Sequence, residues 1–377
     1  MKVLGIVAEY NPFHTGHLYH IEQAKQLIQP DLTIIVMSPS FVQRGEPAII
    51  DKYTRARIAI ENGADIVIEL PLVYAVESAD YFAKGAITLL KEMGVTDLCF
   101  GSEEGCIDTF IEIAKAIEEH QDDYDALIKA AMKQGLRYPD ACNQSLSTLL
   151  NKEIRTPNDL LGLSYVKEVI HSHYAIKLHC IKRTNDYHSN DIEAISSATA
   201  LRMALKEGTD VSALLPGYPY YKDDHFYDLE DFFPYLRYAI LFNQHLEKIH
   251  MVDEGLENLL KTSILSCQSV EELINALTSK RYTRSRISRM LIHILLHNTK
   301  QEIQKAMQID YIRLLAFSKQ GQSYVRYAKT QTDYAIISNI TRHQALALDI
   351  EMRGAKVLSL VERDAYKKEY ATIPYHE

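Results

Sequence analysis

Two histidines near the start of the chain, His14 and His17, have the type and spacing that suit phosphate chemistry. They flank Thr15 and Gly16, and Gly16 lets a phosphate approach the backbone because it has no Cβ. A helix start offers free N–H groups and a partial positive charge to an anion. Histidines there would donate hydrogen bonds to phosphate oxygens as charge builds on them in an in-line displacement. The segment therefore predicts electrostatic stabilisation of a transition state, not nucleophilic catalysis.

Two other interpretations of these histidines stay open at this point. The chain has 15 histidines, so a pair at a helix start can lack any chemical role. A metal site would need carboxylate ligands nearby, and Glu9 is the only one that the segment offers. The elements that surround the histidines favour phosphate binding over both.

These elements are those of an open parallel sheet. The apolar run at 3–7 predicts a buried strand, and apolar residues at helical spacing predict a helix over 17–27. Further strands and helices are predicted in alternation at 32–37, 51–59, 65–70, 78–93, 97–100 and 175–181. Such alternation is typical of βαβ units in an α/β fold. The histidines then stand at the carboxyl end of the first strand, where open sheets bind ligands.

The domain organisation follows from where the alternation stops. Residues 105–150 show helical patterns without strands, which predicts a helical insertion. A Pro- and Gly-rich stretch marks a boundary, so we expect a catalytic domain at 1–215 and a mainly α-helical domain at 216–377. Short strands are predicted within the second domain at 311–315 and 334–337.

The composition fits a globular enzyme. Of the 377 residues, 47% are hydrophobic and 24% are charged, and no apolar run approaches the roughly 18–20 residues of a membrane span. The N-terminal segment turns polar too soon for a signal peptide, so we expect a cytoplasmic protein. The five cysteines form no CxxC pair, which argues against a disulfide framework or a zinc ribbon. The net charge of −9 argues against a nucleic-acid coat protein but leaves room for a local basic patch.

The histidine motif resembles that of the HIGH-type nucleotidyltransferases, which implies their Rossmann-like fold and adenylyl transfer from ATP. The second element of that superfamily is an ISSTxxR-like helix start beside the triphosphate, and residues 195–202 of this chain resemble it. The resemblance implies phosphate contacts by Ser196, Ser197, Thr199 and Arg202. A capped surface helix is the alternative interpretation of this segment.

Nearly the whole chain resembles the bacterial tRNA(Met) cytidine acetate ligases. The stretches that carry this resemblance are 7–14, 41–48, 64–71, 100–103, 156–158, 181–183 and the helix start above. The resemblance implies an enzyme that activates acetate with ATP to acetyl-adenylate and releases pyrophosphate. It then passes the acetyl group to N4 of the wobble cytidine of elongator tRNA(Met). Mg²⁺ is expected with the triphosphate, and no residue is identified as a metal ligand.

The family's nucleotide-binding positions match a loop and three separate residues of this chain. They are Val7, Ala8, Glu9, Tyr10, Asn11, Pro12, Phe13, His14, Thr15, Gly16, His17, Leu18, Tyr19, His20, Gly101, Asn158 and Arg183. Gly101 and Arg183 end predicted strands, and Asn158 lies at a predicted helix start, so each is expected to face the nucleotide. The alternatives are a helix-cap role for Asn158 and a solvated pair of Lys182 and Arg183.

Two further segments are candidates for contacts with the other substrates. Gln43 and Arg44 lie in a loop after the second strand, and Arg44 would hold acetate or the phosphate tail unless the loop is only structural. The residues expected to bind tRNA are Lys280, Arg281, Tyr282, Arg284, Arg286 and Arg289, continued toward the nucleotide by Lys182. The alternative for this run is a solvated helix start whose cations pair with Glu271 and Glu272.

Two functions of other kinds also remain. The acceptor could be a carrier-protein thiol or a small molecule instead of RNA, although the large helical region after residue 216 argues against this. A non-catalytic RNA- or ribosome-binding protein could retain the same fold. The intact His14, Gly16 and His17 argue against loss of catalysis.

Overall fold

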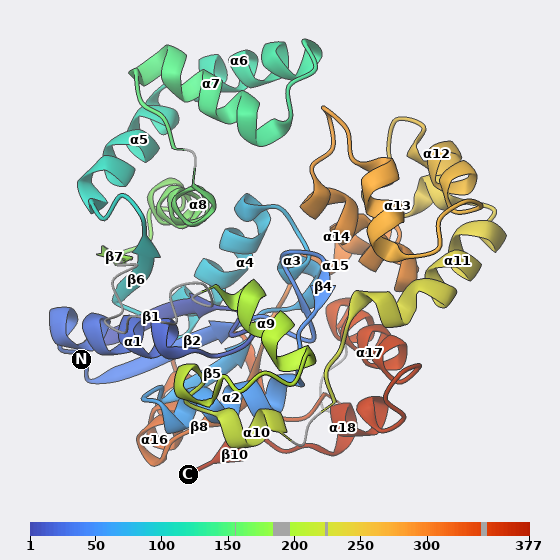
Figure 1. Cartoon of the computed structure of the whole chain (residues 1–377). Coiled ribbons are helices and arrows are strands. Elements are labelled where there is room, and N and C mark those ends of the chain that lie inside the picture. Colours follow the sequence, from blue (N-terminus) through green and yellow to red (C-terminus); the bar gives the residue numbers. More distant parts are fainter. Residues whose placement is uncertain (155, 184–196, 223–224, 341–344) are drawn as a thin grey trace.

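The computed structural model describes residues 1–154, 156–183, 197–222, 225–340 and 345–377. Within these residues an eight-stranded sheet has the order β10-β8-β5-β2-β1-β6-β7, with β9 beside β8 (Figure 1). The strands, including the separate hairpin β3–β4, are β1 (Val3–Ala8), β2 (Leu32–Met37), β3 (Phe41–Val42), β4 (Glu46–Pro47), β5 (Ile66–Glu69), β6 (Asp97–Ser102), β7 (Lys177–Lys182), β8 (Tyr311–Phe317), β9 (Ala335–Ile337) and β10 (Tyr375–His376).

Alternating residues of the strands face two cores on opposite sides of the sheet. β1 and β2 pair in parallel along their whole lengths. Val3 lies in the core that contains α4 (Ala79–Glu92), and Leu4 lies in the core that contains α1 (Thr15–Ile28) and α2 (Lys52–Glu61). Because helices cover both faces, these strands are near-continuous apolar runs, which is the pattern that predicted them.

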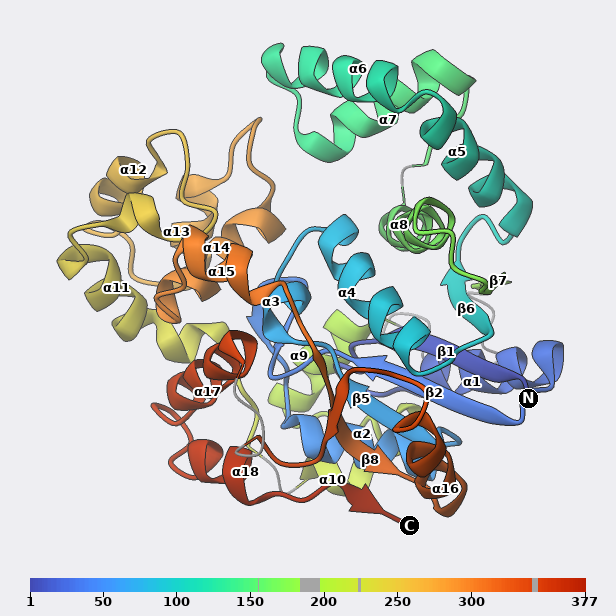
Figure 2. The same cartoon turned by 180° about the vertical axis from the view of Figure 1, so that it is seen from behind.

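Residues 105–150 fold as helices without a strand, as predicted, and form part of the crossover from β6 to β7. The helices of this crossover are α5 (Ile107–Glu119), α6 (Gln121–Lys133), α7 (Tyr138–Leu150) and α8 (Pro157–His171). α8 packs against α4, whereas α6 and α7 stand away from the sheet in both views (Figures 1 and 2). The carboxyl ends of β6 and β7 are thereby held beside the start of α8.

The chain beyond residue 216 is mainly helical, and it also returns to the sheet. The remaining helices are α3 (Leu72–Ala75), α9 (Ala198–Lys206), α10 (Tyr218–Lys222), α11 (Phe233–Phe242), α12 (Leu256–Ser263), α13 (Val270–Leu277), α14 (Arg284–Leu295), α15 (Lys300–Ala306), α16 (Lys319–Ala328), α17 (Leu346–Leu358) and α18 (Ala365–Ala371). β8 and β9 confirm the two strands predicted late in the chain. β8 runs antiparallel to β5, so the sheet is mainly parallel but mixed. The division into domains at residue 216 stays a prediction.

A buried cluster of charges ties the returning segment to β5. Lys52 Nζ lies 2.7 Å from Glu369 Oε1 and 3.8 Å from Glu351 Oε2. Arg313 Nη1 lies 2.9 Å from Glu69 Oε2. Burial raises the pKa of Glu351. Burial also acts to raise the pKa of Glu369, but attraction to Lys52 and Arg313 outweighs it and lowers that pKa. The cluster therefore holds two cations and three carboxyl groups that differ in charge.

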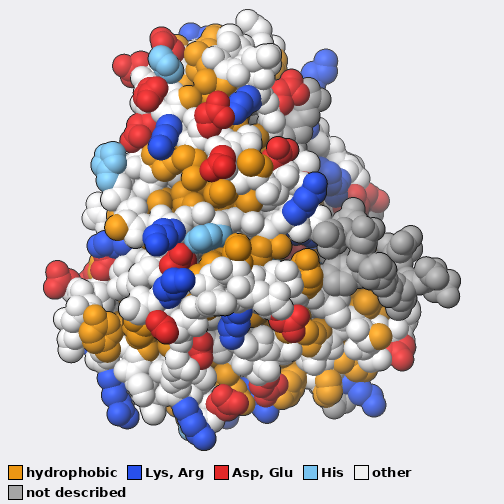
Figure 3. Space-filling view, turned by 90° about the vertical axis from the view of Figure 1, so that its left-hand side faces the viewer, with side chains coloured by type: hydrophobic (Ala, Val, Ile, Leu, Met, Phe, Trp, Pro, Cys, Tyr) orange, Lys and Arg blue, Asp and Glu red, His pale blue; other side chains and the backbone are white. Residues whose placement is uncertain are grey.

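The surface carries charges of both signs. On the face drawn in Figure 3, lysine and arginine side chains are interspersed with acidic ones and do not gather in one patch. In the parts of the chain that the structure describes, no helix combines the length and the apolar character that crossing a membrane requires.

Candidate active site

The loop between β1 and α1 is held by contacts from outside it. Asn11 Oδ1 accepts a hydrogen bond from the Ile49 N–H at 2.7 Å. The Glu9 carbonyl accepts one from Arg55 Nη1 at 2.6 Å. These contacts fix the path of the chain from the end of β1, so that α1 begins directly after His14.

His14 and His17 are neutral and present neighbouring donors. His14 Nδ1 accepts from the Gly16 N–H at 3.0 Å, and His17 Nδ1 accepts from the His14 N–H at 3.3 Å. The two rings stack with their centroids 3.8 Å apart. Burial lowers the pKa of His14 to about 4 and that of His17 well below its usual value, so both rings are neutral near pH 7. Because each Nδ1 is an acceptor, each ring carries its hydrogen on Nε2.

An arginine and a glycine lie beside these histidines. Arg183 directly follows β7, and its charge adds to burial in lowering the pKa of His14, His17 and His20, the last to about 4. The side chain of Arg183 passes close to Gly101, where an added Cβ would lie 3.5 Å from Arg183 Cγ. The parallel pairing of β6 with β7 brings Gly101 and Arg183 to one end of the sheet.

Asn158 reaches the same strand ends from the start of α8. Its Nδ2 donates to the Glu103 carboxylate, which also accepts from Thr156 Oγ1 at 3.0 Å. Asp159 accepts from Ser102 Oγ at 2.6 Å and from the Glu103 N–H at 3.0 Å, which fixes the loop after β6 to α8. Glu103 and Asp159 were not predicted as site residues. Their places directly after a strand and at a helix start were the available signals.

The second predicted phosphate segment meets the histidine loop through α9. Ser197 caps this helix, because its Oγ accepts from a backbone N–H of the first turn at 3.1 Å. Ser196, another of the implied phosphate contacts, lies outside the described residues. Arg202 Nη1 donates to the Asn11 carbonyl at 2.8 Å, and its Nη2 lies 2.8 Å from Glu46 Oε1. Arg202 therefore joins the histidine loop to the hairpin β3–β4.

The hairpin brings Gln43 and Arg44 to the same place. The Gln43 N–H donates to Glu9 Oε1 at 2.8 Å, and Arg44 Nη1 donates to Thr199 Oγ1 at 3.4 Å. Burial raises the pKa of Glu9. The two residues predicted to contact acetate or phosphate thus lie between the histidine loop and α9.

The cations predicted to bind tRNA lie at the start of α14 and have acidic partners. The ion pairs are Arg281–Glu254 at 2.6 Å, Arg284–Glu271 at 2.6 Å and Arg286–Asp253 at 3.1 Å. Tyr282 donates its hydroxyl hydrogen to Glu254 at 2.8 Å. The alternative to tRNA binding was that these cations pair with Glu271 and Glu272. Glu271 does pair with Arg284, whereas Glu272 accepts a hydrogen bond from a backbone N–H. The segment is therefore of mixed charge and not an open run of positive charge.

The other predicted tRNA contacts differ in exposure. Lys182 and Lys280 are exposed. Arg289 instead turns into the protein, where its Nη1 donates to the Gln43 carbonyl at 3.2 Å. The structure thus places Arg289 with the hairpin and apart from the surface cations.

Comparison with known proteins identifies the family. A model of the HIGH Nucleotidyl Transferase family matches residues 1–372. The chain is 36% identical to the tRNA(Met) cytidine acetate ligase of Bacillus subtilis over 394 residues, which cover 98% of this chain and 95% of that protein. It is 38% identical to the one from Oceanobacillus iheyensis over 393 residues, or 98% of each chain. The chain belongs to the tRNA(Met) cytidine acetate ligase family.

Solved structures agree with membership of this acetate ligase family. The crystal structure of Thermotoga maritima TmcAL bound with alpha-thio ATP has a TM-score of 0.91 and 30% sequence identity, covering 100% of this chain and 99% of that one. The apo structure of the same protein has a TM-score of 0.90. The family resemblance carried by the sequence motifs is therefore confirmed, and so is the fold.

In this acetate ligase family member, Arg55 of α2 forms hydrogen bonds with the loops that carry the candidate site. No sequence motif predicted this residue. Its guanidinium is buried and donates to the carbonyls of Glu9, Ser38 and Pro39, the first two at 2.6 and 3.1 Å. Burial lowers the pKa of Arg55 to about 10. The two loop segments that follow β1 and β2 therefore share one internal donor. The only available signal was an arginine on the buried face of α2.

The carboxylates of the site are the protein groups that could bind Mg²⁺, and each already has a partner in the protein. Glu9 accepts from the Gln43 N–H, Glu46 pairs with Arg202, and Glu103 accepts from Asn158. The clusters of possible metal ligands in the described part of the chain are Glu77, His250 and His293, and Glu69, Glu351 and Glu369. Neither includes a residue of the site. Magnesium bound with a nucleotide usually takes one or two protein carboxylates and completes its shell with waters and phosphate oxygens.

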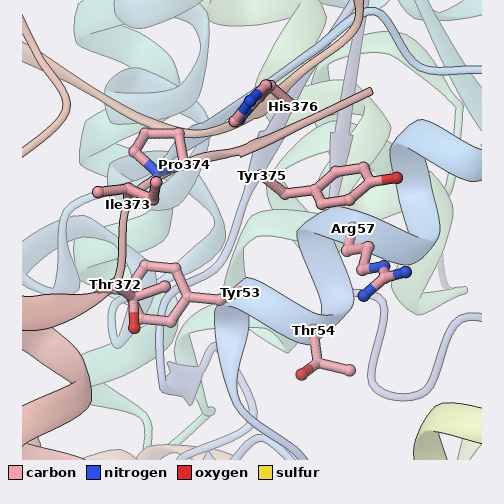
Figure 4. Close-up of a pocket in the computed structure, with 8 residues that line it drawn as sticks. All are labelled: Tyr53, Thr54, Arg57, Thr372, Ile373, Pro374, Tyr375 and His376. Carbon is pink, nitrogen blue, oxygen red and sulfur yellow. The ribbon is translucent and has the colours of Figure 1, made fainter.

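A pocket of about 350 Å³ lies elsewhere, between α2 and the C-terminal strand β10 (Figure 4). It is lined by Tyr53, Thr54, Arg57, Thr372, Ile373, Pro374, Tyr375 and His376. The Arg57 guanidinium stacks on the rings of Tyr220 and Tyr375 and pairs with Glu61 at 2.9 Å. The pocket contains none of the predicted site residues.

Proposed function

We propose that this chain is an ATP-dependent tRNA(Met) cytidine acetate ligase. It activates acetate as acetyl-adenylate and transfers the acetyl group to N4 of the wobble cytidine of elongator tRNA(Met). The observation that carries the chemistry is the pair of neutral histidines with Nε2–H donors at the start of α1. Family membership supports the choice of acetate and tRNA(Met), because the relatives named above are tRNA(Met) cytidine acetate ligases.

The first step needs electrostatic stabilisation and no proton transfer. An acetate oxygen forms a bond to the α-phosphorus while the bond to the β-phosphate oxygen breaks, and pyrophosphate leaves. Negative charge on the phosphoryl oxygens is met by the Nε2–H groups of His14 and His17 and by the partial positive charge at the start of α1. Arg183 adds a positive charge close enough to these rings to lower their pKa values. Such donors need no reorganisation as the charge develops.

The second step transfers the acetyl group to RNA. The N4 amine forms a bond to the acetyl carbonyl carbon, the bond from that carbon to the phosphate oxygen breaks, and AMP leaves. The amine loses one proton, which passes to the leaving phosphate of AMP or to water. A nucleobase can enter the site only as an unpaired base, which an anticodon wobble position provides.

Several further assignments belong to the same proposal. Mg²⁺ accompanies the triphosphate and neutralises part of its charge. The nucleotide contacts are the loop from Val7 to His20 with Gly101, Asn158 and Arg183, joined by Ser196, Ser197, Thr199 and Arg202. The helical region after residue 216 supplies part of the tRNA surface. ATP and tRNA as substrates favour a cytoplasmic enzyme.

The deciding experiment is incubation with ATP, labelled acetate and total tRNA, followed by nucleoside analysis. We expect label in N4-acetylcytidine and none without ATP. Acetate-dependent exchange of pyrophosphate into ATP without any label in RNA would instead favour a carrier-protein thiol or small-molecule acceptor. Absence of both activities in folded protein would contradict the proposal.

A further inference from the structure

The hairpin β3–β4 lies between the candidate active site and helix α14. On the side of the site, the Gln43 N–H donates to Glu9 Oε1 at 2.8 Å. On the opposite side, the Gln43 carbonyl accepts from Arg289 Nη1 at 3.2 Å. The backbone of one residue therefore connects α14 to the loop that carries the histidines.

The hairpin also meets α14 backbone to backbone. Gly45 has a φ of +81°, and a Cβ added there would lie 2.3 Å from Arg289 N and 2.4 Å from the carbonyl carbon of Ser288. Neither the backbone conformation of Gly45 nor the space between Gly45 and α14 admits a side chain. The position of the hairpin is therefore set directly by the path of α14.

Arg289 is placed unlike the other arginines of its helix. Arg284 and Arg286 have side chains that are 49% and 26% exposed and pair with surface acids. Burial lowers the pKa of Arg289 to about 10, against an opposing effect of Glu77. Its Nε is buried and has no hydrogen-bond partner among the described residues. Arg289 is half-buried like Arg286, and the feature that distinguishes it is its hydrogen bond to the Gln43 carbonyl of the hairpin.

We infer that Arg289 is a positioning residue for acetyl-adenylate formation, which it serves by holding the hairpin against the histidine loop. The inference rests on the function proposed above. Glu46 of the same hairpin pairs with Arg202, which in turn donates to the Asn11 carbonyl. A displaced hairpin therefore moves the Glu9 and Asn11 contacts of the loop together. In active sites a shift of about 1 Å costs about a hundredfold in rate.

The test compares Arg289→Gln with wild type in acetate-dependent ATP–pyrophosphate exchange without tRNA. We expect kcat to fall by about tenfold to a hundredfold. Arg289→Lys should recover part of the loss, because lysine can still donate one hydrogen bond to the Gln43 carbonyl. The salt dependence of tRNA binding should keep its slope, since no phosphate contact is removed.

Arg353→Gln is the matched control. Arg353 also donates to a backbone carbonyl, that of Leu296 at 3.2 Å, and pairs with Glu302 at 3.1 Å, but these contacts join α14 and α15 to α17. This variant should keep the wild-type rate of exchange. Wild-type exchange in Arg289→Gln, together with weaker tRNA binding and a flatter salt dependence, would overturn the inference and make Arg289 an RNA contact.

Gly45→Ala supplies a second and independent test if Arg289→Gln fails to fold. It pushes the hairpin off α14 while it leaves the guanidinium intact, so exchange should fall as in Arg289→Gln. Gly255→Ala is its control, because Gly255 has a φ of +87° with nothing within 4 Å of an added Cβ. Wild-type exchange in folded Gly45→Ala would also overturn the inference. A wild-type protein without exchange would instead contradict the proposed function itself.

Discussion

At the scale of single residues, each ring nitrogen of the histidine pair has a separate task. The Nδ1 atoms of His14 and His17 bind backbone N–H groups and so build the helix start. The function proposed above assigns the Nε2–H groups to phosphate oxygens. On that proposal, each histidine both supports the start of α1 and stabilises the reaction.

His17→Ala is expected to abolish measurable adenylate formation while the protein stays folded. Loss of one preorganised donor to a developing charge costs roughly 3–4 kcal/mol of barrier. Acetate-dependent pyrophosphate exchange measures this, and circular dichroism checks the fold. Exchange at the wild-type rate in the purified variant would remove His17 from the catalytic group.

Stability should fall as the pH falls from about 6.5 to about 4. The pKa of His14 is lowered from its ordinary 6.5 to about 4 by burial. Below 6.5 the unfolded chain binds a proton that the folded protein does not, which favours unfolding by up to about 1.4 kcal/mol per pH unit for one such group. Denaturant titrations across this range should show a smaller slope for His14→Asn, which retains a capping side chain. An unchanged slope would mean that His14 is protonated in the folded protein.

At the scale of elements, the buried cluster fastens β8, α17 and α18 to β5 and α2. Its three carboxyl groups are not equivalent, since burial raises the pKa of Glu351 while Lys52 and Arg313 hold that of Glu369 low. Glu351 is accordingly easier to protonate than Glu369. The C-terminal helices therefore depend on Glu369 more than on Glu351.

Glu369→Gln should lower the free energy of unfolding by about 3–5 kcal/mol, because it removes the carboxylate that both buried cations, Lys52 and Arg313, share. Glu351→Gln is the matched comparison and should cost less than about 1 kcal/mol at pH 7. Its amide oxygen can still accept the hydrogen bond that Glu351 receives from the Leu72 N–H. Urea unfolding of both variants measures the difference, and equal losses would show that Glu351 is also ionised.

At the scale of the whole molecule, an acidic protein must bind a polyanion through a local surface. The net charge is −9, and the arginines at the start of α14 have acidic partners at the surface. RNA phosphates would replace these acids as partners. The RNA contacts proposed for this segment therefore involve an exchange of ion pairs along with the release of counterions.

Changing Arg284 and Arg286 together to Glu should weaken tRNA binding and flatten its salt dependence. Each lost phosphate contact reduces the slope of log K against log salt by about 0.7–0.9. Filter binding at several salt concentrations measures both quantities. Normal affinity in the double variant would place the RNA surface on another part of the molecule.

Local patterns predicted the elements that carry the histidines, whereas contacts between distant segments were not predictable. Asp51 is a typical capping residue, and it accepts from the N–H groups of Tyr53 and Thr54 at the start of α2. The antiparallel place of β8 beside β5 leaves no comparable local signal. Contacts of Arg55 and Arg289 with the site depend on which backbones approach each other, and that is decided by packing across the whole chain.

The late return of the chain to the sheet has a consequence for synthesis on the ribosome. Glu69 at the end of β5 and Arg313 in β8 are 244 residues apart in sequence. At about 5–20 residues per second, a ribosome needs roughly ten seconds to a minute to cover that distance. Throughout this interval the nascent chain carries β5 as an open strand edge, which is a template for pairing with other chains. We therefore expect newly made copies of this protein to be prone to pairing along β5 until β8 emerges.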